Sequence, residues 1–255
     1  MRGLKDQVAI VTGAGSGIGR AIALRLAEER MKVAVLDVNA DSAAATVAAI
    51  SEGGGVAAAE TCDICDYSAV QHAVASVEER LGPVHTLVNN AGWDTPMPFL
   101  KTTPDFWSKV VAINYLGPIN ATHAVVGRMV KRNSGRVIFI ASDAGRVGSS
   151  GEVVYSGCKG ATIAFAKALA REVARNNVLL NCLCPGPTNT PAMDAFVGTG
   201  EQGQKIRDAM VRGVPLGRIG EPTDYPGLVA FLASDDAAFM TGQTISVSGG
   251  LTMHG

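Results

Sequence analysis

The chain alternates between short apolar runs and longer amphipathic segments. Seven runs are rich in Val, Ile, Leu and Ala and end in turn residues, as β-strands do. They cover residues 8–13, 32–38, 56–63, 85–90, 136–142, 178–185 and 243–250. Between them, apolar residues recur at three- and four-residue spacing, as in 18–30 and 67–82, and this spacing predicts helices.

This alternation predicts a fold class. Near-continuous apolar strands separated by helices are typical of βαβ units, in which helices cover both faces of a parallel sheet. No Pro- or Gly-rich linker interrupts the pattern, so we predict one α/β domain over residues 1–255, a doubly wound sheet of Rossmann type. In residues 187–220 the strand signals vanish and Gly and Pro accumulate, which predicts a substrate loop inserted after the sixth strand.

Composition and charge narrow the function classes. With 47% hydrophobic and 18% charged residues, the chain is too apolar and too weakly charged to be disordered. A net charge of −1 gives no electrostatic footprint for nucleic acid or an anionic membrane. No apolar stretch reaches the roughly 18 residues of a membrane span, and the N-terminus lacks the apolar core of a signal peptide. We therefore expect a cytoplasmic protein without nucleic-acid or membrane partners.

The five cysteines form an odd set in a chain without an export signal, which argues against a disulfide framework. Cys62 and Cys65 form a C-x-x-C pair, which is compatible with redox chemistry or half of a zinc site. No second pair or neighbouring His supplies further ligands, so we expect no metal and favour ordinary reduced thiols.

The segment TGAGSGIG, residues 12–19, follows the first strand and opens the first long helix. A dinucleotide pyrophosphate binds helix N-terminal amides at this place in Rossmann-type folds. The spacing of Gly13, Gly17 and Gly19 departs from a literal G-x-G-x-x-G. Glycines at these positions still permit a tight turn and a close approach of phosphate to the backbone.

Asp37 ends the second strand, 18 residues after Gly19. A carboxylate there is placed to accept hydrogen bonds from an adenosine ribose and to repel a 2′-phosphate. No Lys or Arg lies in the neighbouring GAGSG and LDVNADS segments, so the sequence favours NAD over NADP. A helix N-cap or turn role for Asp37 stays open.

Tyr155 and Lys159 are four residues apart in YSGCK, so in a helix they share one face. A nearby cation favours the phenolate and lowers the pKa of a tyrosine from its ordinary value near 10. The pair therefore predicts a general acid and base. An isolated Y-x-x-x-K is more often a solvated helix pair, so the interpretation depends on the rest of the chain.

Six features in order resemble the short-chain dehydrogenase/reductase family: T-G-x-x-x-G-x-G at 12–19, NNAG at 89–92, Asn114, Ser142, Y-x-x-x-K at 155–159 and PG at 185–186. The match spans essentially the whole chain. The resemblance implies a seven-stranded parallel sheet in a single Rossmann-type domain. It also implies hydride transfer between NAD(H) and a secondary alcohol or ketone, and a homotetramer.

The resemblance assigns roles to individual residues. Tyr155 takes the place of the proton-transfer tyrosine, and Lys159 that of the lysine which lowers its pKa and holds the nicotinamide ribose. Ser142 corresponds to the hydroxyl that hydrogen-bonds the substrate oxygen. Asn114 corresponds to the residue that holds a water between Lys159 and solvent. The implied cofactor-binding residues are Gly13, Ser16, Gly17, Ile18, Gly19, Asp37, Asp63, Ile64, Asn90, Ala91, Gly92, Tyr155, Lys159, Pro185, Gly186, Thr188 and Thr190.

Thr188 departs from the family's usual Val or Ile, and Pro187 stiffens the turn beside it, so this part of the cofactor set is less well defined.

The substrate pocket is expected from residues 92–99, 143–154 and 187–212. The amino-acid sequence of these segments resembles that of NAD-dependent dehydrogenases of alicyclic secondary alcohols. This implies a ring-bearing alcohol or ketone, and more narrowly a 2-hydroxycyclohexanecarboxyl-CoA-like thioester. The expected substrate-binding residues are Trp93, Ser142, Arg146, Val147 and Tyr155. Met97, Phe99 and Phe196 would extend an apolar wall, and the candidate partners of CoA phosphates are Arg146, Lys205, Arg207 and Arg212.

Other functions stay open at this point. A general carbonyl reductase and a 3-oxoacyl-carrier-protein reductase would use the same catalytic residues. A non-catalytic NAD-binding sensor belongs to a different class, and the presence of Ser142, Tyr155 and Lys159 together argues against it.

Overall fold

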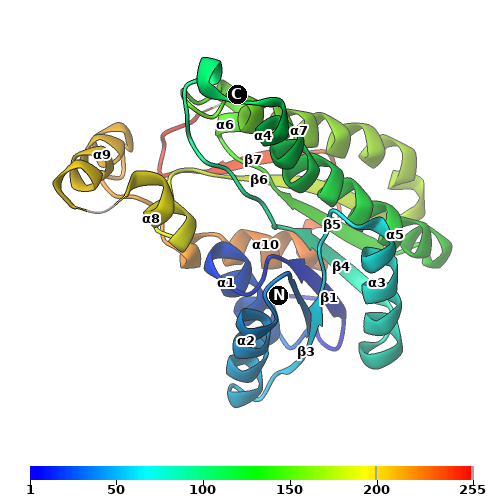
Figure 1. Ribbon diagram of the computed structural model, residues 1–255. Coiled ribbons are helices and arrows are strands. Elements are labelled where there is room, and N and C mark those ends of the chain that lie inside the picture. The colour runs from blue at the N-terminus through cyan, green and yellow to red at the C-terminus, as the bar shows by residue number, and fades with distance from the viewer. Residues whose placement is uncertain (199, 254–255) are drawn as a thin grey trace.

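A parallel sheet of seven strands lies between two layers of helices in the computed structural model, which describes residues 1–198 and 200–253 (Figure 1). The strand order is β3-β2-β1-β4-β5-β6-β7. The strands are β1 (Val8–Thr12), β2 (Lys32–Asp37), β3 (Val56–Thr61), β4 (Val84–Asn89), β5 (Gly135–Ile140), β6 (Val178–Pro185) and β7 (Thr244–Val247). All seven predicted strands and the doubly wound class are confirmed.

The strand β7 is shorter than the predicted run 243–250. Gly249 and Gly250 adopt positive φ angles of 63° and 88°, which a strand does not accommodate. The pair therefore forms a turn after Val247. Apolar periodicity alone did not reveal this end, because the run contains no charged residue.

Two hydrophobic cores lie on the two faces of the sheet. In β1, Val8 and Ile10 belong to one core and Ala9 and Val11 to the other, as the two-residue period of a strand requires. The first core packs under α3 (Tyr67–Leu81), α5 (Gly117–Arg132) and α7 (Val153–Val173). The second packs under α1 (Gly17–Glu28), α2 (Ala40–Glu52) and α10 (Pro226–Ala233).

The strand order reverses between β1 and β4, since β2 lies on one side of β1 and β4 on the other. Connections leave in opposite directions at such a switch point, so a crevice opens at the carboxyl ends of the strands. The connections that border this edge include the glycine-rich turn, the segment after β4 and the segment after β6.

The helical segment between β4 and β5 is interrupted. A 3-10 turn η1 (Phe99–Lys101) precedes α4 (Pro104–Val111), and a π-helical turn η2 (Ala112–Leu116) joins α4 to α5. Such π turns are often found at functional sites. Asn114 lies in this turn and is fully buried.

The segment between β6 and β7 carries α8 (Pro191–Val197) and α9 (Gly200–Gly213), which project from the body of the protein (Figure 1). The part of this segment that carries α8 and α9 begins at Thr188 and ends at Gly220, and these two residues form a parallel bridge. The amide of Asn189 donates to Gly220 O (2.8 Å), and the amide of Gly220 donates to Pro187 O (2.9 Å). The inserted segment therefore leaves and re-enters the fold at one place.

The remaining short elements are α6 (Ala144–Val147), η3 (Ala174–Asn176), η4 (Pro222–Asp224) and η5 (Asp235–Ala237).

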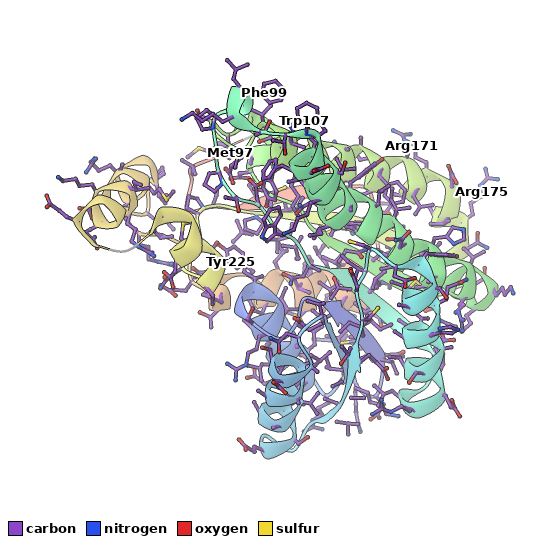
Figure 2. All side chains as sticks on the ribbon, in the orientation of Figure 1. Met97, Phe99, Trp107, Arg171, Arg175 and Tyr225 are labelled. Carbon is purple, nitrogen blue, oxygen red and sulfur yellow. The ribbon has the colours of Figure 1, made fainter. Side chains whose placement is uncertain are left out.

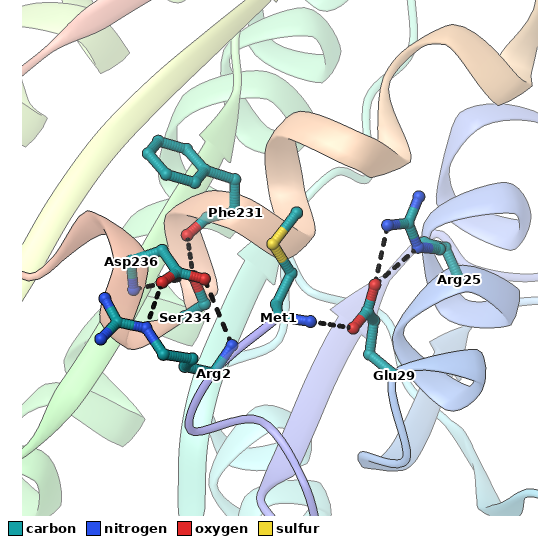
Figure 3. A network of polar contacts seen from close by, with 7 residues as sticks. All are labelled: Met1, Arg2, Arg25, Glu29, Phe231, Ser234 and Asp236. Atoms are coloured by element: carbon teal, nitrogen blue, oxygen red, sulfur yellow. Dashed lines mark hydrogen bonds and ion pairs between the residues drawn. The ribbon is translucent and has the colours of Figure 1, made fainter.

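The N-terminal residues bind to α1 and η5 (Figure 3). The amino group of Met1 and the guanidinium of Arg25 both contact the carboxylate of Glu29, each at 2.7 Å. The backbone amide and the side chain of Arg2 donate to Asp236. These contacts fix the chain on its approach to β1.

Among the described residues, no helix is both long enough and apolar enough to span a bilayer.

Candidate active site

A cavity of about 1590 Å³ opens at the carboxyl ends of β1, β4, β5 and β6. Pockets for a single small ligand are typically about 300–1,000 Å³, so this one is large. Most of the site residues predicted from the sequence line it: Gly13, Ser16, Gly17, Ile18, Asp37, Asp63, Ile64, Asn90, Ala91, Gly92, Trp93, Ser142, Val147, Tyr155, Lys159, Pro185, Gly186, Thr188 and Thr190.

Three glycines are required in the turn between β1 and α1. Gly13 and Gly17 have φ angles of 61° and 53°, a region that other residues rarely adopt. A Cβ at Gly13 would lie 2.9 Å from the Cα of Ala91, and a Cβ at Gly19 would lie 2.2 Å from Gly13 O. Gly19 itself does not line the cavity. Its role is to let α1 begin directly against the turn.

The N-terminus of α1 is open to a ligand. Ser16 is its N-cap residue, and the Ser16 side chain makes no capping hydrogen bond. The first amides of a helix have no partner within the helix, and they carry a partial positive charge. An anion such as a pyrophosphate fits this position.

The hydroxyl of Thr12 joins the glycine-rich turn to the segment after β4. It accepts hydrogen bonds from the amides of Asn90 and Ala91, each at 3.0 Å. The side chain of Asn90 donates in return to Thr12 O (2.9 Å) and Gly13 O (3.1 Å). The sequence analysis gave Thr12 no role. Its signal was a lone hydroxyl at the end of an apolar strand, where the chain turns.

Asp37 is held at the edge of the cavity by two backbone amides. Gly15 donates to its Oδ2 (2.8 Å) and Asn39 to its Oδ1 (2.9 Å). The N-cap of α2 is Asn39, whose side chain accepts from Ser42. Asp37 is therefore a turn residue and not the helix cap, and the amides fix its carboxylate beside the glycine-rich turn.

Asp63 and Ile64 follow β3, which pairs with β2, and the amide of Cys62 donates to Asp37 O (3.0 Å) at this end. Asp63 is exposed and accepts from the amide of Cys65 (2.9 Å). Ile64 is buried beneath Gly117, where a Cβ would lie 2.4 Å from the Ile64 Cδ1 atom. Burial raises the pKa of both Cys62 and Cys65 to about 11, so these thiols stay protonated at neutral pH.

Ser142 and Tyr155 meet at the centre of the cavity. Ser142 follows β5, and its Oγ accepts from the amide of Ala144 (3.1 Å). Tyr155 lies in the first turn of α7, and its hydroxyl comes close enough to Ser142 for that hydroxyl to lower the pKa of the phenol. The two hydroxyls converge on one place, where both can contact a single substrate oxygen.

Lys159 lies one turn further along α7 and is 4% exposed. Its Nζ donates to Ile140 O (3.0 Å) and lies 5.4 Å from the centre of the Tyr155 ring. Burial lowers the pKa of Lys159 to about 8. α6 packs tightly against α7 at this residue, since a Cβ at Gly145 would lie 2.7 Å from the Lys159 carbonyl carbon.

Lys159 is not among the groups that shift the pKa of Tyr155 in this arrangement, so its effect on that pKa stays a prediction. Burial raises the pKa of Tyr155 above its ordinary value, and the negative charge of Glu152 raises it further, while the hydrogen bond from Ser142 lowers it. The ammonium group contacts the Ile140 carbonyl and the side of the ring.

Asn114 supports the site from below and does not line it. Its Nδ2 donates to Trp93 O (2.6 Å) and Val110 O (3.0 Å), and its Oδ1 accepts from the amide of Trp93 (3.2 Å). A Cβ at Gly92 would lie 3.0 Å from this Oδ1 and 3.5 Å from Lys159 Nζ. Asn114 and Lys159 thus face the same glycine, which keeps the space between them open.

The end of β6 and the residues that follow it form another wall of the cavity. The hydroxyl of Thr188 donates to Gly186 O (2.8 Å) and shares a short hydrogen bond with the buried hydroxyl of Tyr225. Tyr225 lies at the start of α10, below α8 (Figure 2). Thr190 caps α8 by accepting from the amide of Met193 (3.2 Å). A valine at 188 would lack both contacts, so Thr188 and Tyr225 form a polar link that the family's usual Val or Ile does not allow.

The expected substrate wall is confirmed only in part. Trp93 and Val147 line the cavity, and Met193, Met210 and Leu251 add apolar surface. Met97 and Phe99 are not among its lining residues. Phe99 stacks on Trp107 instead, with ring centres 6.1 Å apart, at the outer end of α4 (Figure 2). The side chain of Phe196 lies outside the described part of the structure.

Arg146 was predicted to bind the substrate, but it does not line the cavity. Its guanidinium donates to the hydroxyl of Ser246 (2.9 Å) and to Thr244 O (3.4 Å), on β7 and away from the cavity. On α9, Lys205 pairs with Glu201 and Arg207 with Asp194 of α8. No arginine is among the described residues that line the cavity, so the proposed cradle for CoA phosphates is not supported there.

Three carboxylates without a predicted role also line the cavity, Asp94, Asp143 and Glu152, of which Asp94 and Glu152 lie in two separate loops. The amide of Met97 donates to Gly151 O (2.9 Å), and this contact brings their two segments together. Burial raises the pKa of Asp94 to about 6. The available signal was an acidic residue beside Trp93 in a segment already expected to form the pocket.

Comparisons with known proteins agree with this geometry. Residues 13–252 match the family described as enoyl-(acyl carrier protein) reductase. The chain is 38% identical to acetoacetyl-CoA reductase of Shinella zoogloeoides over 96% of its length and 98% of that protein. It is 34% identical to (2S)-[(R)-hydroxy(phenyl)methyl]succinyl-CoA dehydrogenase subunit BbsD of Thauera aromatica, over 98% of each chain. It is 36% identical to 3-oxoacyl-[acyl-carrier-protein] reductase of Synechocystis sp., over 99% and 100%.

Solved structures share the whole fold. A variant of actinorhodin polyketide ketoreductase with NADPH superposes with a TM-score of 0.92, at 34% identity, over 100% of both chains. NAD⁺-bound xylitol dehydrogenase gives a TM-score of 0.92 at 33% identity, over 98% of this chain and 100% of the other. These comparisons do not support the narrower resemblance to 2-hydroxycyclohexanecarboxyl-CoA dehydrogenases, and the neighbours carry both NAD and NADPH.

Proposed function

The chain belongs to the short-chain dehydrogenase/reductase family of oxidoreductases, and from this we propose that it oxidises a ring-bearing 3-hydroxyacyl thioester or a related secondary alcohol with NAD. The observation that carries the proposal is the convergence of the Ser142 and Tyr155 hydroxyls in a cavity that also has a glycine-rich phosphate turn. A bound nicotinamide dinucleotide supplies or accepts the hydride in such a reaction.

The residues present fit such a cofactor. The open amides of α1 and the close approach allowed by Gly13 and Gly17 suit its pyrophosphate. The carboxylate of Asp37 is fixed beside that turn, where it suits a ribose with free hydroxyls. The cations among the described lining residues are Lys109 and Lys159, and neither belongs to the Asp37 side of the cavity. This charge pattern supports NAD over NADP.

The protein's own groups account for the proton transfer. Ser142 orients the substrate oxygen by a hydrogen bond and supports the negative charge that develops on it. Tyr155 takes the proton from the alcohol during oxidation and returns it during reduction. Lys159 lies along the cofactor-facing wall, and Asn114 keeps the Trp93 segment in place beside it. The complete set of hydroxyls and the lysine argues against a non-catalytic NAD sensor.

The substrate class follows from shared chemistry. The names of the Shinella and Thauera relatives describe thioesters whose reacting oxygen lies on the carbon β to the thioester carbonyl. A 2-hydroxycyclohexanecarboxyl-CoA has the same arrangement within a ring. Trp93, Val147 and the two methionines of the inserted segment give an apolar wall suited to a ring, and the Thauera substrate carries a phenyl group by name.

A second candidate is reduction of a short linear 3-oxoacyl thioester, on CoA or on an acyl carrier protein. The names of the Shinella and Synechocystis relatives favour it. A general carbonyl reductase would accept the ketones of both candidates without a thioester. The large cavity favours the bulkier substrate.

The test follows NADH formation with 2-hydroxycyclohexanecarboxyl-CoA, 3-hydroxybutyryl-CoA, cyclohexanols and 1-arylethanols. We expect turnover of the ring-bearing compounds by the unmodified protein. Tyr155→Phe should retain NAD binding and lose turnover by about 10²-fold or more, since the ring stays and the transferable proton goes. Tyr67→Phe is the matched control, because that hydroxyl contacts His123 on the protein's outer surface.

Turnover by Tyr155→Phe close to that of the unmodified protein would refute the mechanism. Turnover of the linear thioester alone would refute the ring-bearing substrate and leave the second candidate standing.

A further inference from the structure

We propose that Asp94 is a specificity-determining residue that excludes substrates carrying a free carboxylate beside the reacting carbon. The inference rests on the proposed function and deepens it, because it concerns the charge of the group that enters next to Tyr155. Neutral thioesters, esters and unsubstituted ring alcohols enter, and the corresponding free acids do not.

Asp94 lies in the part of the cavity near Tyr155. The residue follows Trp93 and lines the cavity near Tyr155, close enough for its negative charge to act on that phenol. Its Oδ2 atom is buried and has no hydrogen-bond partner among the residues that the structure describes. Above the raised pKa of about 6, the charge of Asp94 has no donor at this oxygen to compensate it, and it acts on a group that occupies the neighbouring part of the cavity.

Other carboxylates that line the cavity add to the negative charge of Asp94. Glu152 lies on the paired segment, and its charge acts on both Asp94 and Tyr155. Asp143 also lines this end, with its Oδ1 bound by Ser246 and its Oδ2 without a described partner. Asp94 and Glu152 therefore act on the place where the substrate reacts, whereas Asp143 is linked through Ser246 to Arg146.

The lysines do not neutralise this wall. The Nζ of Lys109 lies 3.8 Å from the centre of the Trp93 ring and forms no ion pair with the described carboxylates. Lys159 contacts the Ile140 carbonyl instead of an acidic group. A substrate carboxylate next to Asp94 and Glu152 would be repelled by both of these groups.

The consequence separates this chain from one of its relatives. The succinyl group named for the Thauera enzyme carries a free carboxylate in addition to its thioester. The acidic wall of this cavity opposes such a group when it lies beside the reacting carbon. The inferred substrate is thus a thioester or alcohol without that second acid.

The experiment compares ethyl 2-hydroxycyclohexanecarboxylate with the free acid 2-hydroxycyclohexanecarboxylate, which share the ring and the reacting alcohol. The ratio of kcat/KM for ester over acid should be about 50-fold or more in the unmodified protein. Asp94→Asn, which keeps the shape and removes the charge, should lower that ratio about tenfold by raising kcat/KM for the acid. Asp105→Asn is the matched control, because Asp105 is exposed on α4 and does not line the cavity.

Each result of this experiment either supports or refutes the inference about Asp94. If the unmodified protein oxidises the acid as well as the ester, the inference is wrong. It is also wrong if Asp94→Asn leaves the ratio unchanged, or if Asp105→Asn shifts it equally. Should Asp94→Asn fail to fold, the ratio in the unmodified protein and in Glu152→Gln gives the answer instead. Absence of NADH from every alcohol and thioester in the panel refutes the proposed function itself, which is a different result.

Discussion

Replacement of Asp37 by Asn should shift the cofactor preference towards NADP. The carboxylate of Asp37 is fixed by the amides of Gly15 and Asn39 at the edge of the cavity. A 2′-phosphate on a ribose bound at this edge would bring a second negative charge towards Asp37, and about 5 Å serves as a working separation. At an effective dielectric constant near 20, two unit charges at that separation repel by about 3 kcal/mol, which corresponds to roughly a 100-fold factor. Asn retains one oxygen, so the variant removes the charge and keeps one of the two contacts with the amides of Gly15 and Asn39.

The assay measures kcat/KM for NAD and for NADP with one saturating alcohol substrate at fixed ionic strength. We expect the NAD-to-NADP ratio to fall by about 100-fold in Asp37→Asn, with salt reducing the effect. The matched control is Asp41→Asn, because Asp41 is an exposed acid in the first turn of α2 and does not line the cavity. A preference for NADP in the unmodified protein would refute the reasoning. A change of less than threefold in the variant, or an equal change in Asp41→Asn, would do so too.

Three further outcomes are expected. Gly19→Ala places a Cβ 2.2 Å from Gly13 O, so calorimetry should detect little NAD binding and the free energy of unfolding should fall by about 2 kcal/mol or more. The control Gly127→Ala lies in open space on α5 and should raise the free energy of unfolding by about 0.5–1 kcal/mol. Wild-type NAD affinity in Gly19→Ala would contradict this prediction. Burial, with Arg136 nearby, lowers the pKa of His85 to about 4 from 6.5, so the unfolded chain binds a proton between these values that the folded protein does not, and stability should fall by about 2 kcal/mol from pH 7 to pH 5. His85→Gln should abolish most of that loss and the exposed His72→Gln none of it, and equal acid sensitivity in all three proteins would count against the assignment. Light scattering should report a homotetramer at micromolar concentration, as expected from the family resemblance, and a 26.3 kDa monomer would exclude it.

The sheet could be predicted from the sequence because buried parallel strands are apolar along their whole length. In β5, for example, every residue from Gly135 to Ile140 is buried, and only turn residues interrupt such runs. The glycine-rich turn was equally legible. Gly13 and Gly19 leave room for backbone and amide atoms of Asn90 and Ala91, and no other residue would fit there.

The substrate side of the cavity was less predictable because it depends on directions that sequence spacing does not encode. Arg146 occupies one turn of helix beside the cavity, yet its side chain turns towards Ser246 on β7. Phe99 was expected to form a wall, but the 3-10 turn at Phe99–Lys101 carries it outwards onto Trp107. The acidic character of the wall emerged only when the contact between Met97 and Gly151 brought two separate loops together.

The electrostatic relation of Tyr155 and Lys159 illustrates a further limit. Four-residue spacing correctly placed both side chains on one face of α7. It carried no information about burial, which here acts on both groups and raises the pKa of one while it lowers the pKa of the other. The acceptor of the ammonium group, Ile140 O, comes from a strand 19 residues earlier in the chain.

The bridge between Thr188 and Gly220 has a consequence for how this protein can diversify. Because the intervening segment begins and ends at one point, its length and sequence can change with only a small loop-closure cost and without a change in strand register. The turn that suits the cofactor and the hydroxyls of Ser142 and Tyr155 lie on the sheet side of that point. Duplicated copies of such a gene can therefore acquire new substrates by exchange of a single surface segment, while the hydride-transfer chemistry is inherited intact.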